Sequence, residues 1–364
     1  MKITNTELSL ETWESIKINK DNQVFLNRLR GMSILRVVLS HLGLSWLYTP
    51  YSQVISVFLP ILFFVSGAIS IYIYSRSRNT YVYFFHRLTS QLLPVYIIVL
   101  LSFLFIYILS GGLSFDIGSI ARWLQLIPKS SDMPFPLGQV WFIHTLILIS
   151  LFSTVIFYIS KCYVKILPLT VVITFIFSYV QLFYPLGDLF SIYGHNIYKP
   201  IVHSSFFFFG AFWVLNPKAK IFNYSGLISI LFLCLALFSF WSLDLEFKMT
   251  KHVYFPDGYY VSFSFFAVFI VLAMKGVITK VFDRVNFIDR FVLFFSKHAY
   301  SIFISHSLFI FLFEKYILID DSWPKLIEIV IKILMVILAS CIVAPTVSKS
   351  TDFFVKRTRL ILKV

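Results

Sequence analysis

The chain has 364 residues, of which 59% are hydrophobic and only 13% are charged, and its formal net charge is +14. This composition excludes an ordinary soluble domain and is typical of an all-α polytopic membrane protein embedded in a lipid bilayer. A soluble nucleic-acid-binding protein would concentrate its basic residues on one water-facing surface. Here they lie between long apolar runs, so we predict no nucleic-acid partner. The three cysteines lack the spacing of metal ligands, and we predict no metal site.

The polar N-terminal segment, residues 1–24, contains glutamates and does not match a cleaved signal peptide. We expect it to form a cytoplasmic tail. Residues 25–349 would form the membrane domain, and residues 350–364 a basic cytoplasmic C-terminal tail. No internal repeat is visible. The longest loop, residues 111–137, would lie outside the membrane on the external side, as a binding loop or as a plain connector.

Apolar runs of about 20 residues, the length that crosses a bilayer, predict about ten transmembrane helices. They cover residues 31–48, 52–74, 89–110, 138–160, 166–184, 201–215, 225–243, 259–275, 291–313 and 326–348. Lysine and arginine favour the cytoplasmic side of a membrane. With both termini in the cytoplasm, the basic residues concentrate in the cytoplasmic segments, while the external loops mix them with acids. The alternation therefore supports ten spans with cytoplasmic N- and C-termini, because an odd count or one missed helix would scramble the pattern.

The first predicted helix carries two ionisable residues, Arg30 and His41, which are eleven positions apart. At about 1.5 Å and 100° per residue, they are separated by about 16 Å and about three turns, so both side chains project from one face. An ionisable group inside a membrane indicates function. A neutral imidazole can take a proton from a hydroxyl near pH 7, and we predict that His41 is the catalytic base and Arg30 a further catalytic residue.

The structural alternatives for these two residues are an anchoring role for Arg30 at the membrane surface and a polar helix–helix contact for His41. Arg36 lies elsewhere on the same helix, and the sequence does not identify its partner.

This segment, LNRLRGMSILRVVLSH, resembles the first helix of the acyltransferase-3 family of integral-membrane acyltransferases, which reads LDxLRGIAIxxVVxxH. Arg30 and His41 stand at the matching positions. Asn27 replaces a usual aspartate, and Arg36 replaces a usual apolar residue. Neither difference removes the predicted base.

The second predicted helix contains LFFVSGAIS, which is similar to the family's FFxxSGF segment. Ser66 and Gly67 would let two helices approach closely, and that packing role is also the structural alternative.

The basic stretch before the third helix, SRSRNTYVYFFHRLTSQLLPVY, resembles the corresponding stretch of the family, which has two arginines. This chain has Arg87, with Gln91 in place of the second arginine. Arg76, Arg78 and Arg87 would supply positive charge to the phosphates of a coenzyme. Each of them, taken singly, is equally explained as an ordinary cation on the cytoplasmic side.

Two further segments resemble the family. GQVWFIHTLILIS matches its WF segment at Trp141, a residue that commonly anchors a helix at the membrane interface, and is followed by His144, a second histidine in a span. SKHAYSIFISH resembles GKxSYxIYLxH, with Tyr300 and His306 at matching positions. They are six residues apart, about 600°, and so face different sides of the helix. His306 would orient the acceptor or pack against the catalytic helix, and a hydrogen-bonded core histidine is the alternative.

Members of the acyltransferase-3 family move an acyl group, often acetyl from acetyl-CoA, to hydroxyls of surface sugars. The resemblance implies an O-acetyltransferase of the bacterial inner membrane that modifies a lipid-linked or cell-surface glycan such as O-antigen, capsule or exopolysaccharide. His41 would act as general base or as a transient acetyl carrier. The alternative class is a carrier or flippase without acyl transfer, since intramembrane arginine and histidine also mark transport paths. The sequence identifies neither the sugar nor the oligomeric state.

Overall fold

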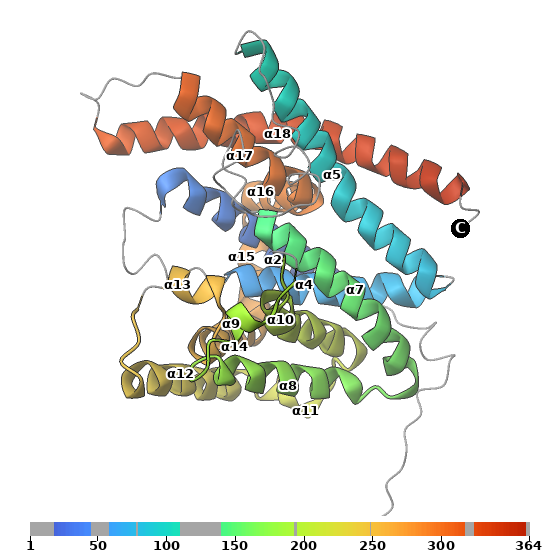
Figure 1. Cartoon of the computed structure of the whole chain (residues 1–364), viewed down its shortest axis with the longest axis vertical. Coiled ribbons are helices and arrows are strands. Elements are labelled where there is room, and N and C mark those ends of the chain that lie inside the picture. The colour runs from blue at the N-terminus through green and yellow to red at the C-terminus, as the bar shows by residue number, and fades with distance from the viewer. Residues whose placement is uncertain are drawn as a thin grey trace, which may run out of the picture.

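The computed structural model describes residues 18–44, 58–77, 79–109, 140–192, 195–247, 249–316 and 324–361, and these are almost entirely helical (Figure 1). The N-terminal half contains α2 (Lys20–Leu39), the π-helical turn η1 (Ser40–Leu44), α4 (Phe58–Arg76), α5 (Thr80–Leu109), α7 (Val140–Cys162), α8 (Ile166–Val180) and α9 (Leu186–Leu189). A short antiparallel pair follows, β1 (Ser191–Ile192) with β2 (His195–Asn196). The C-terminal half contains α10 (Tyr198–Leu215), α11 (Lys220–Asn223), α12 (Ser225–Ser242), α13 (Met249–Tyr254), α14 (Gly258–Ala273), α15 (Lys275–Arg284), α16 (Asn286–Lys297), α17 (Ala299–Tyr316) and α18 (Lys325–Ile361). The predicted all-α class is confirmed.

Each of the ten predicted spans overlaps at least one helix: in chain order, α2 with η1, α4, α5, α7, α8, α10, α12, α14 with the first residue of α15, α16 with α17, and α18. The predicted ninth span, 291–313, therefore lies on two helices, which meet at His298. Among the described residues, five helices are long and apolar enough to cross a membrane. The number is six if α14 and α15, which meet at a 61° bend, form one broken span. The chain is therefore an integral, polytopic membrane protein. Ten spans, and the cytoplasmic position of both termini, stay predictions.

The helix boundaries differ from the predicted spans because backbone hydrogen bonding does not stop at the membrane surface. α2 begins at Lys20, after the N-cap Asn19, whose side chain accepts a hydrogen bond from the Asp21 backbone amide. α18 continues to Ile361, through most of the predicted C-terminal tail, and its 37 residues extend about 55 Å at 1.5 Å per residue, more than the hydrocarbon core of a bilayer. Residues 1–17 and the predicted external loop 111–137 lie outside the described residues.

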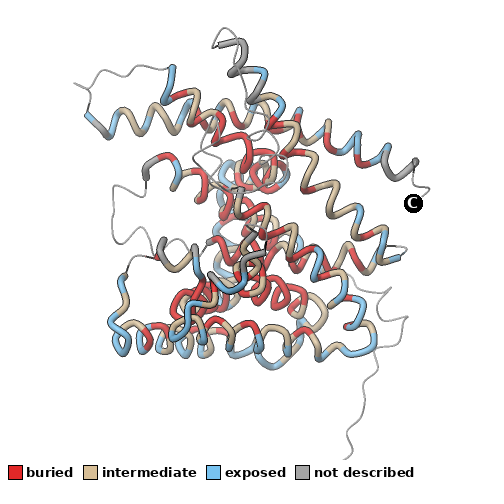
Figure 2. Tube along the Cα trace, in the orientation of Figure 1, coloured by how far each residue is buried: buried red, intermediate tan, exposed pale blue. Residues whose placement is uncertain are grey.

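The helices pack in an order that places the central pair α4 and α10 in the protein interior. In Figure 1, α18 and α17 lie at one edge, α8 and α12 lie at the opposite edge, and α2, α4 and α10 lie between them. Figure 2 shows the same arrangement as burial, with buried residues in the middle of the bundle and exposed residues along the outer helices.

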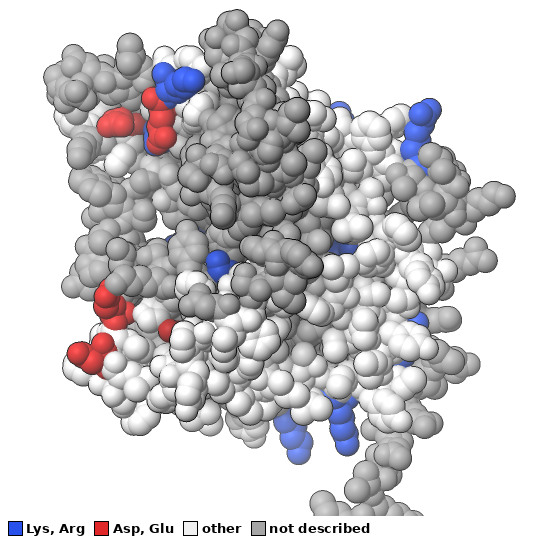
Figure 3. Space-filling view, in the orientation of Figure 1, with Lys and Arg blue, Asp and Glu red and all other residues white. Residues whose placement is uncertain are grey.

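The outer helices expose apolar stripes that repeat every three or four residues, which is the period of one helix face. The exposed residues are Leu169, Val172, Ile173 and Ile176 on α8; Leu227, Ile230, Leu231 and Phe238 on α12; and Val330, Leu334, Leu338 and Ile342 on α18. In water these stripes would be unfavourable, whereas in a membrane they face lipid. In Figure 3 the described surface in the lower part of the view is mostly uncharged, with acidic side chains at its left edge and basic side chains at its lower edge.

Two glycines bring α4 and α10 into direct backbone contact. A Cβ atom added at Gly67 would lie 1.7 Å from the carbonyl oxygen of Phe207, and one added at Gly210 would lie 1.9 Å from the carbonyl oxygen of Phe64. Only hydrogen fits at these positions, as in other close crossings of membrane helices. The predicted packing role of Gly67 is therefore confirmed, and the crossing places Ser66 in the interior.

Arg28 ties the start of α2 to α15 and α16. Its side chain is 4% exposed, and its guanidinium group donates to Asp283 and to Asp289, both at 2.7 Å. A buried arginine with two carboxylate partners is well satisfied, whereas the same arginine alone would be strongly destabilising. These ion pairs fix the rotation of α2 and so determine which way Arg30 points.

Candidate active site

A cavity of about 210 Å³ lies between α2, α4, α5, α7, α16 and α17. Its polar lining consists of Arg30, Ser66, Arg87, Ser90, Gln91, Ser296, Lys297 and Tyr300, and its apolar lining of Ile34, Leu62, Phe142, Leu146, Ala299 and Phe303. Lys297 both lines the cavity and is exposed, so the cavity opens beside it. Pockets for whole drug-sized ligands hold about 300–1,000 Å³, so this cavity suits one polar part of a larger molecule.

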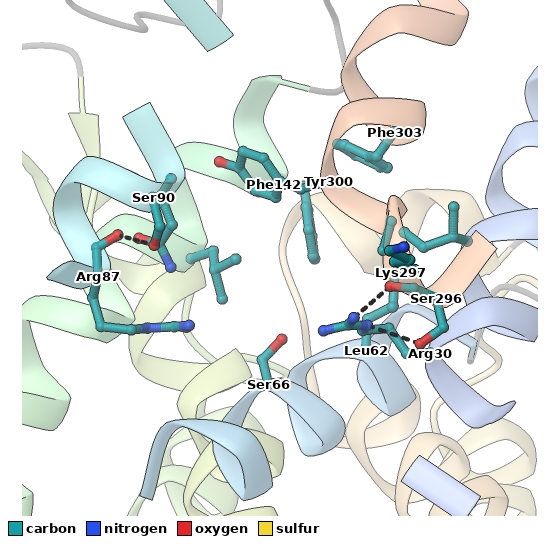
Figure 4. Close-up of a pocket in the computed structure, with 14 residues that line it drawn as sticks. Arg30, Leu62, Ser66, Arg87, Ser90, Phe142, Ser296, Lys297, Tyr300 and Phe303 are labelled. Carbon is teal, nitrogen blue, oxygen red and sulfur yellow. Dashed lines mark hydrogen bonds between the residues drawn. The ribbon is translucent and has the colours of Figure 1, made fainter. Parts of the chain in front are cut away.

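Arg30 and Arg87 approach the cavity from opposite sides. Figure 4 shows their guanidinium groups pointing toward one another, with the Ser66 hydroxyl between them. Arg30 is held by Ser296, since its Nε donates to Ser296 Oγ at 3.2 Å and its Nη2 donates to the Ser296 carbonyl oxygen. None of the described residues that line the cavity is acidic. Two cations that face each other without an acid repel one another, so the cavity favours an anion.

Three polar atoms on the cavity wall have no hydrogen-bond partner among the described residues. They are Arg87 Nε, Gln91 Oε1 and Tyr300 Oη. Gln91 is held in place by its other amide atom, because its Nε2 donates to Ser150 Oγ at 3.0 Å. Buried polar atoms usually have a partner, and such exceptions occur where a ligand or water binds. The wall therefore offers a ligand one guanidinium N–H donor, one hydroxyl group and one amide oxygen acceptor.

His41 and His306 form a pair in the elements that follow α2 and α16 along the chain. His41 lies in η1 and is exposed, whereas His306 lies in α17 and is fully buried. Nδ1 of His41 lies 2.9 Å from Nε2 of His306. π-helical turns such as η1 are frequent at functional sites.

The two clusters are joined by parallel helices. Arg30 contacts Ser296 and, eleven residues later, His41 contacts His306. The two segments, residues 30–41 and 296–306, advance in the same direction, which agrees with the predicted first and ninth spans crossing the membrane the same way. The separation along α2 is about 16 Å at 1.5 Å per residue. The structure thus places Arg30 in α2 and His41 in η1, both on the side that faces α16 and α17, but in separate clusters.

The remaining predicted site residues lie in different places. Tyr300 lines the cavity, so it and His306 point to different clusters, as their spacing predicts. Arg76 is exposed, with its guanidinium carbon 4.2 Å from the centre of the Tyr72 ring, and does not line the cavity. Arg78 lies outside the described residues. His144 is half-buried on α7 and is not part of the lining.

Trp141 lies in a second polar cluster. Its ring is 5.3 Å from the Lys199 ammonium group and 6.0 Å from the His203 ring. His203 is fully buried, and both of its ring nitrogens, like the Tyr260 hydroxyl beside it, lack a hydrogen-bond partner among the described residues. His203 was not predicted as a site residue, although a histidine inside an apolar helix was a usable signal in the sequence. Lys297 and Ser296 were likewise not predicted as site residues.

Helices with lipid-facing stripes around a cationic cavity and a histidine pair define an integral membrane protein with a polar site inside its helix bundle. Residues 23–345 match the acyltransferase domain model of the acyltransferase-3 family. Because the match covers most of the chain, the protein belongs to this family and is a membrane acyltransferase. No curated protein and no solved structure matches the chain.

Proposed function

We propose that this protein transfers an acetyl group from acetyl-CoA to a sugar hydroxyl of a lipid-linked or cell-surface glycan in the bacterial inner membrane. The observation that carries the proposal is the arrangement along α2. A cavity with two facing arginines and no acidic residue among its described lining lies about three turns from an exposed histidine in η1, the π-helical turn that follows α2.

The cationic cavity supports a phosphate-bearing donor. Arginine suits phosphate because its planar group donates two parallel hydrogen bonds. In this proposal Arg30 and Arg87 bind the diphosphate of coenzyme A, and Lys297 attracts it at the mouth of the cavity. The cavity has room for the diphosphate alone. The flexible pantetheine arm would run along α2 and carry the thioester toward His41. Arg78 stays a candidate for donor binding, whereas the exposed position of Arg76 gives it no contact with this cavity.

The chemistry then falls to His41. As a general base, its ring nitrogen takes the proton of the sugar hydroxyl while the hydroxyl oxygen attacks the thioester carbonyl carbon. The C–S bond breaks, and coenzyme A leaves as a thiolate that accepts the proton. As a nucleophile, His41 would first form acetyl-histidine with release of coenzyme A, and the sugar hydroxyl would then take the acetyl group. Both routes need an unprotonated, accessible nitrogen, and the exposure of His41 supports this.

The acceptor side of the proposal rests on the family and on the lipid-facing surface. A glycan attached to a lipid, or a growing surface polymer, would reach His41 at its exposed side chain. If the coenzyme binds from the cytoplasm and the glycan lies outside, the acetyl group crosses the membrane within the helix bundle. A carrier or flippase with the same helices would release no coenzyme A.

The test measures acetyl transfer from radiolabelled acetyl-CoA to the glycan fraction of membranes that contain wild type or His41→Ala. We expect label with wild type only, together with release of free coenzyme A. The inserted amount of both proteins is matched by quantifying the detergent-extracted chain. Label that is equal with His41→Ala would refute the role of His41, and absence of coenzyme A release by wild type would favour the carrier.

A further inference from the structure

The hydrogen bonds of His306 determine which ring nitrogens of His41 and His306 carry a proton. Its Nδ1 lies 3.2 Å from the carbonyl oxygen of Ile302, one helical turn earlier in α17. A carbonyl oxygen can only accept a hydrogen bond, so Nδ1 of His306 carries a proton and donates it.

His306 is 0% exposed, and burying an unpaired charge is costly. The neutral form of its ring is therefore favoured. A neutral imidazole has one N–H group and one nitrogen with a free lone pair. Because Nδ1 is protonated, Nε2 of His306 must be the acceptor. The nitrogen that faces it, Nδ1 of His41 at 2.9 Å, must therefore carry a proton.

The orientation of the rings suits this hydrogen bond. Their planes are 9° apart, and their centres are 5.2 Å apart although the two nitrogens are only 2.9 Å apart. The rings therefore meet edge to edge in nearly one plane, and the His41 N–H group points along the lone pair of His306, the geometry that strong hydrogen bonds prefer.

We infer that His306 is a positioning residue that holds His41 in the Nδ1-protonated tautomer and so leaves its Nε2 unprotonated for the reaction. Free neutral histidine prefers the opposite tautomer, in which Nε2 carries the proton and cannot act as base or nucleophile. The backbone carbonyl of Ile302 thus sets the state of the reactive nitrogen through two hydrogen bonds in series. The catalytic consequence rests on the proposed function, whereas the tautomer itself does not.

The hydrogen-bond series resembles the logic by which a buried carboxylate orients a catalytic histidine in a hydrolase triad, where the wrong tautomer greatly lowers kcat. Here the orienting group is neutral. It fixes the tautomer without placing a buried negative charge in the membrane interior, where an unpaired carboxylate would be costly.

Two substitutions separate tautomer control from packing. His306→Gln can keep an acceptor oxygen close to the position of Nε2, whereas His306→Phe keeps the ring shape and removes the acceptor. Ser307→Ala serves as the matched control, because Ser307 is equally buried on α17 and its hydroxyl bonds only to the Ile304 carbonyl among the described residues.

The first measurement is the ¹⁵N spectrum of histidine-labelled protein in liposomes at about pH 8.5, where an ordinary imidazole is neutral. The chain has eight histidines, and the His41 signals are identified by their loss in His41→Ala. We expect a protonated Nδ1 and an unprotonated Nε2 for His41 in wild type, His306→Gln and Ser307→Ala, and the reverse in His306→Phe. A protonated Nε2 in wild type, or an unchanged tautomer in His306→Phe, would overturn the inference.

The second measurement is acetyl transfer. We expect His306→Phe to lower kcat by about 100-fold, the low end of what a positioned acid–base group contributes, with KM for acetyl-CoA unchanged. His306→Gln should restore most of this loss. A purely structural role would instead reduce the folded fraction of both variants and leave kcat per folded molecule intact. If wild type transfers no acetyl group, the proposed function fails, while the spectrum still decides whether His306 sets the tautomer.

Discussion

The guanidinium groups of Arg30 and Arg87 point toward one another across a cavity that has no acidic residue in its described lining. The Arg28 side chain, two residues before Arg30, has two carboxylate partners. The two neighbouring arginines therefore differ in charge balance. Two carboxylates neutralise Arg28, whereas Arg30 has, among the described residues, hydrogen bonds to the Ser296 hydroxyl and carbonyl only.

Replacing Arg87 with alanine should weaken binding of the donor. A hydrogen bond to a charged group contributes about 1.5–3 kcal/mol, so we expect KM for acetyl-CoA to rise by about 10- to 100-fold. The measurement is initial transfer rate against acetyl-CoA concentration in liposomes. Arg76→Ala is the matched control, because Arg76 is exposed and stacks on Tyr72. An equal rise in KM for both variants would contradict a specific role for the cavity.

Gln91→Glu tests the charge of the cavity with almost no change in shape. The new carboxylate would stand on the wall that already holds Arg87 and would compete with the phosphates of the donor for its guanidinium group. We expect KM for acetyl-CoA to rise by about tenfold, equivalent to about 1.4 kcal/mol, and the rise to shrink at high salt, which screens charge interactions. Gln91→Asn is the neutral control. If the two variants behave alike, the cavity does not bind an anion.

The position of Arg30 and His41 could be predicted from the sequence because helical period alone determines which residues share a face. The ten apolar runs likewise predicted where helices occur, although not where they end. Their ends follow from capping, as at Asn19, and from helices that continue past the membrane surface, as α18 does.

The contacts between helices could not be predicted in the same way. His41 meets His306 across 265 positions of sequence, and Arg30 meets Ser296 across 266. Such pairings depend on the rotation of each helix, which is set here by the Arg28 ion pairs and the Gly67–Gly210 crossing. Lys297 was missed because a lysine at a helix end has the same sequence pattern whether it anchors the helix or lines a cavity.

Gly67→Ala should destabilise the core of the bundle. A Cβ atom there would lie 1.7 Å from a backbone oxygen of α10, which cannot move without shifting the whole helix. Overpacking of this kind costs about 1–3 kcal/mol, and we expect a lower midpoint of thermal unfolding in detergent. Gly226→Ala on α12 is the control, since no atom lies within 4 Å of its added Cβ. Equal midpoints for the two variants would show that α4 and α10 do not cross this closely.

The pair His252 and Asp257 should make stability depend on pH. Nδ1 of His252 lies 2.5 Å from an Asp257 carboxylate oxygen, and its Nε2 lies 3.1 Å from the Glu246 carbonyl oxygen, so both nitrogens face acceptors. Burial lowers the pKa of His252, but the hydrogen bond and the negative charge of Asp257 outweigh burial, and the pKa is raised above its ordinary value. The histidine is on α13, a short helix of six residues.

Because the folded state binds this proton more tightly than the unfolded state, the stabilisation is fully present below the unfolded pKa of about 6.5. It is lost as the pH rises through the raised folded value. We therefore expect the thermal midpoint of wild type to exceed that of His252→Gln most at acid pH, and the difference to shrink as the pH rises. Unfolding of both proteins is followed across a pH series in one detergent. A difference that stays constant or grows with pH would show that the imidazolium form is not what the Asp257 carboxylate stabilises.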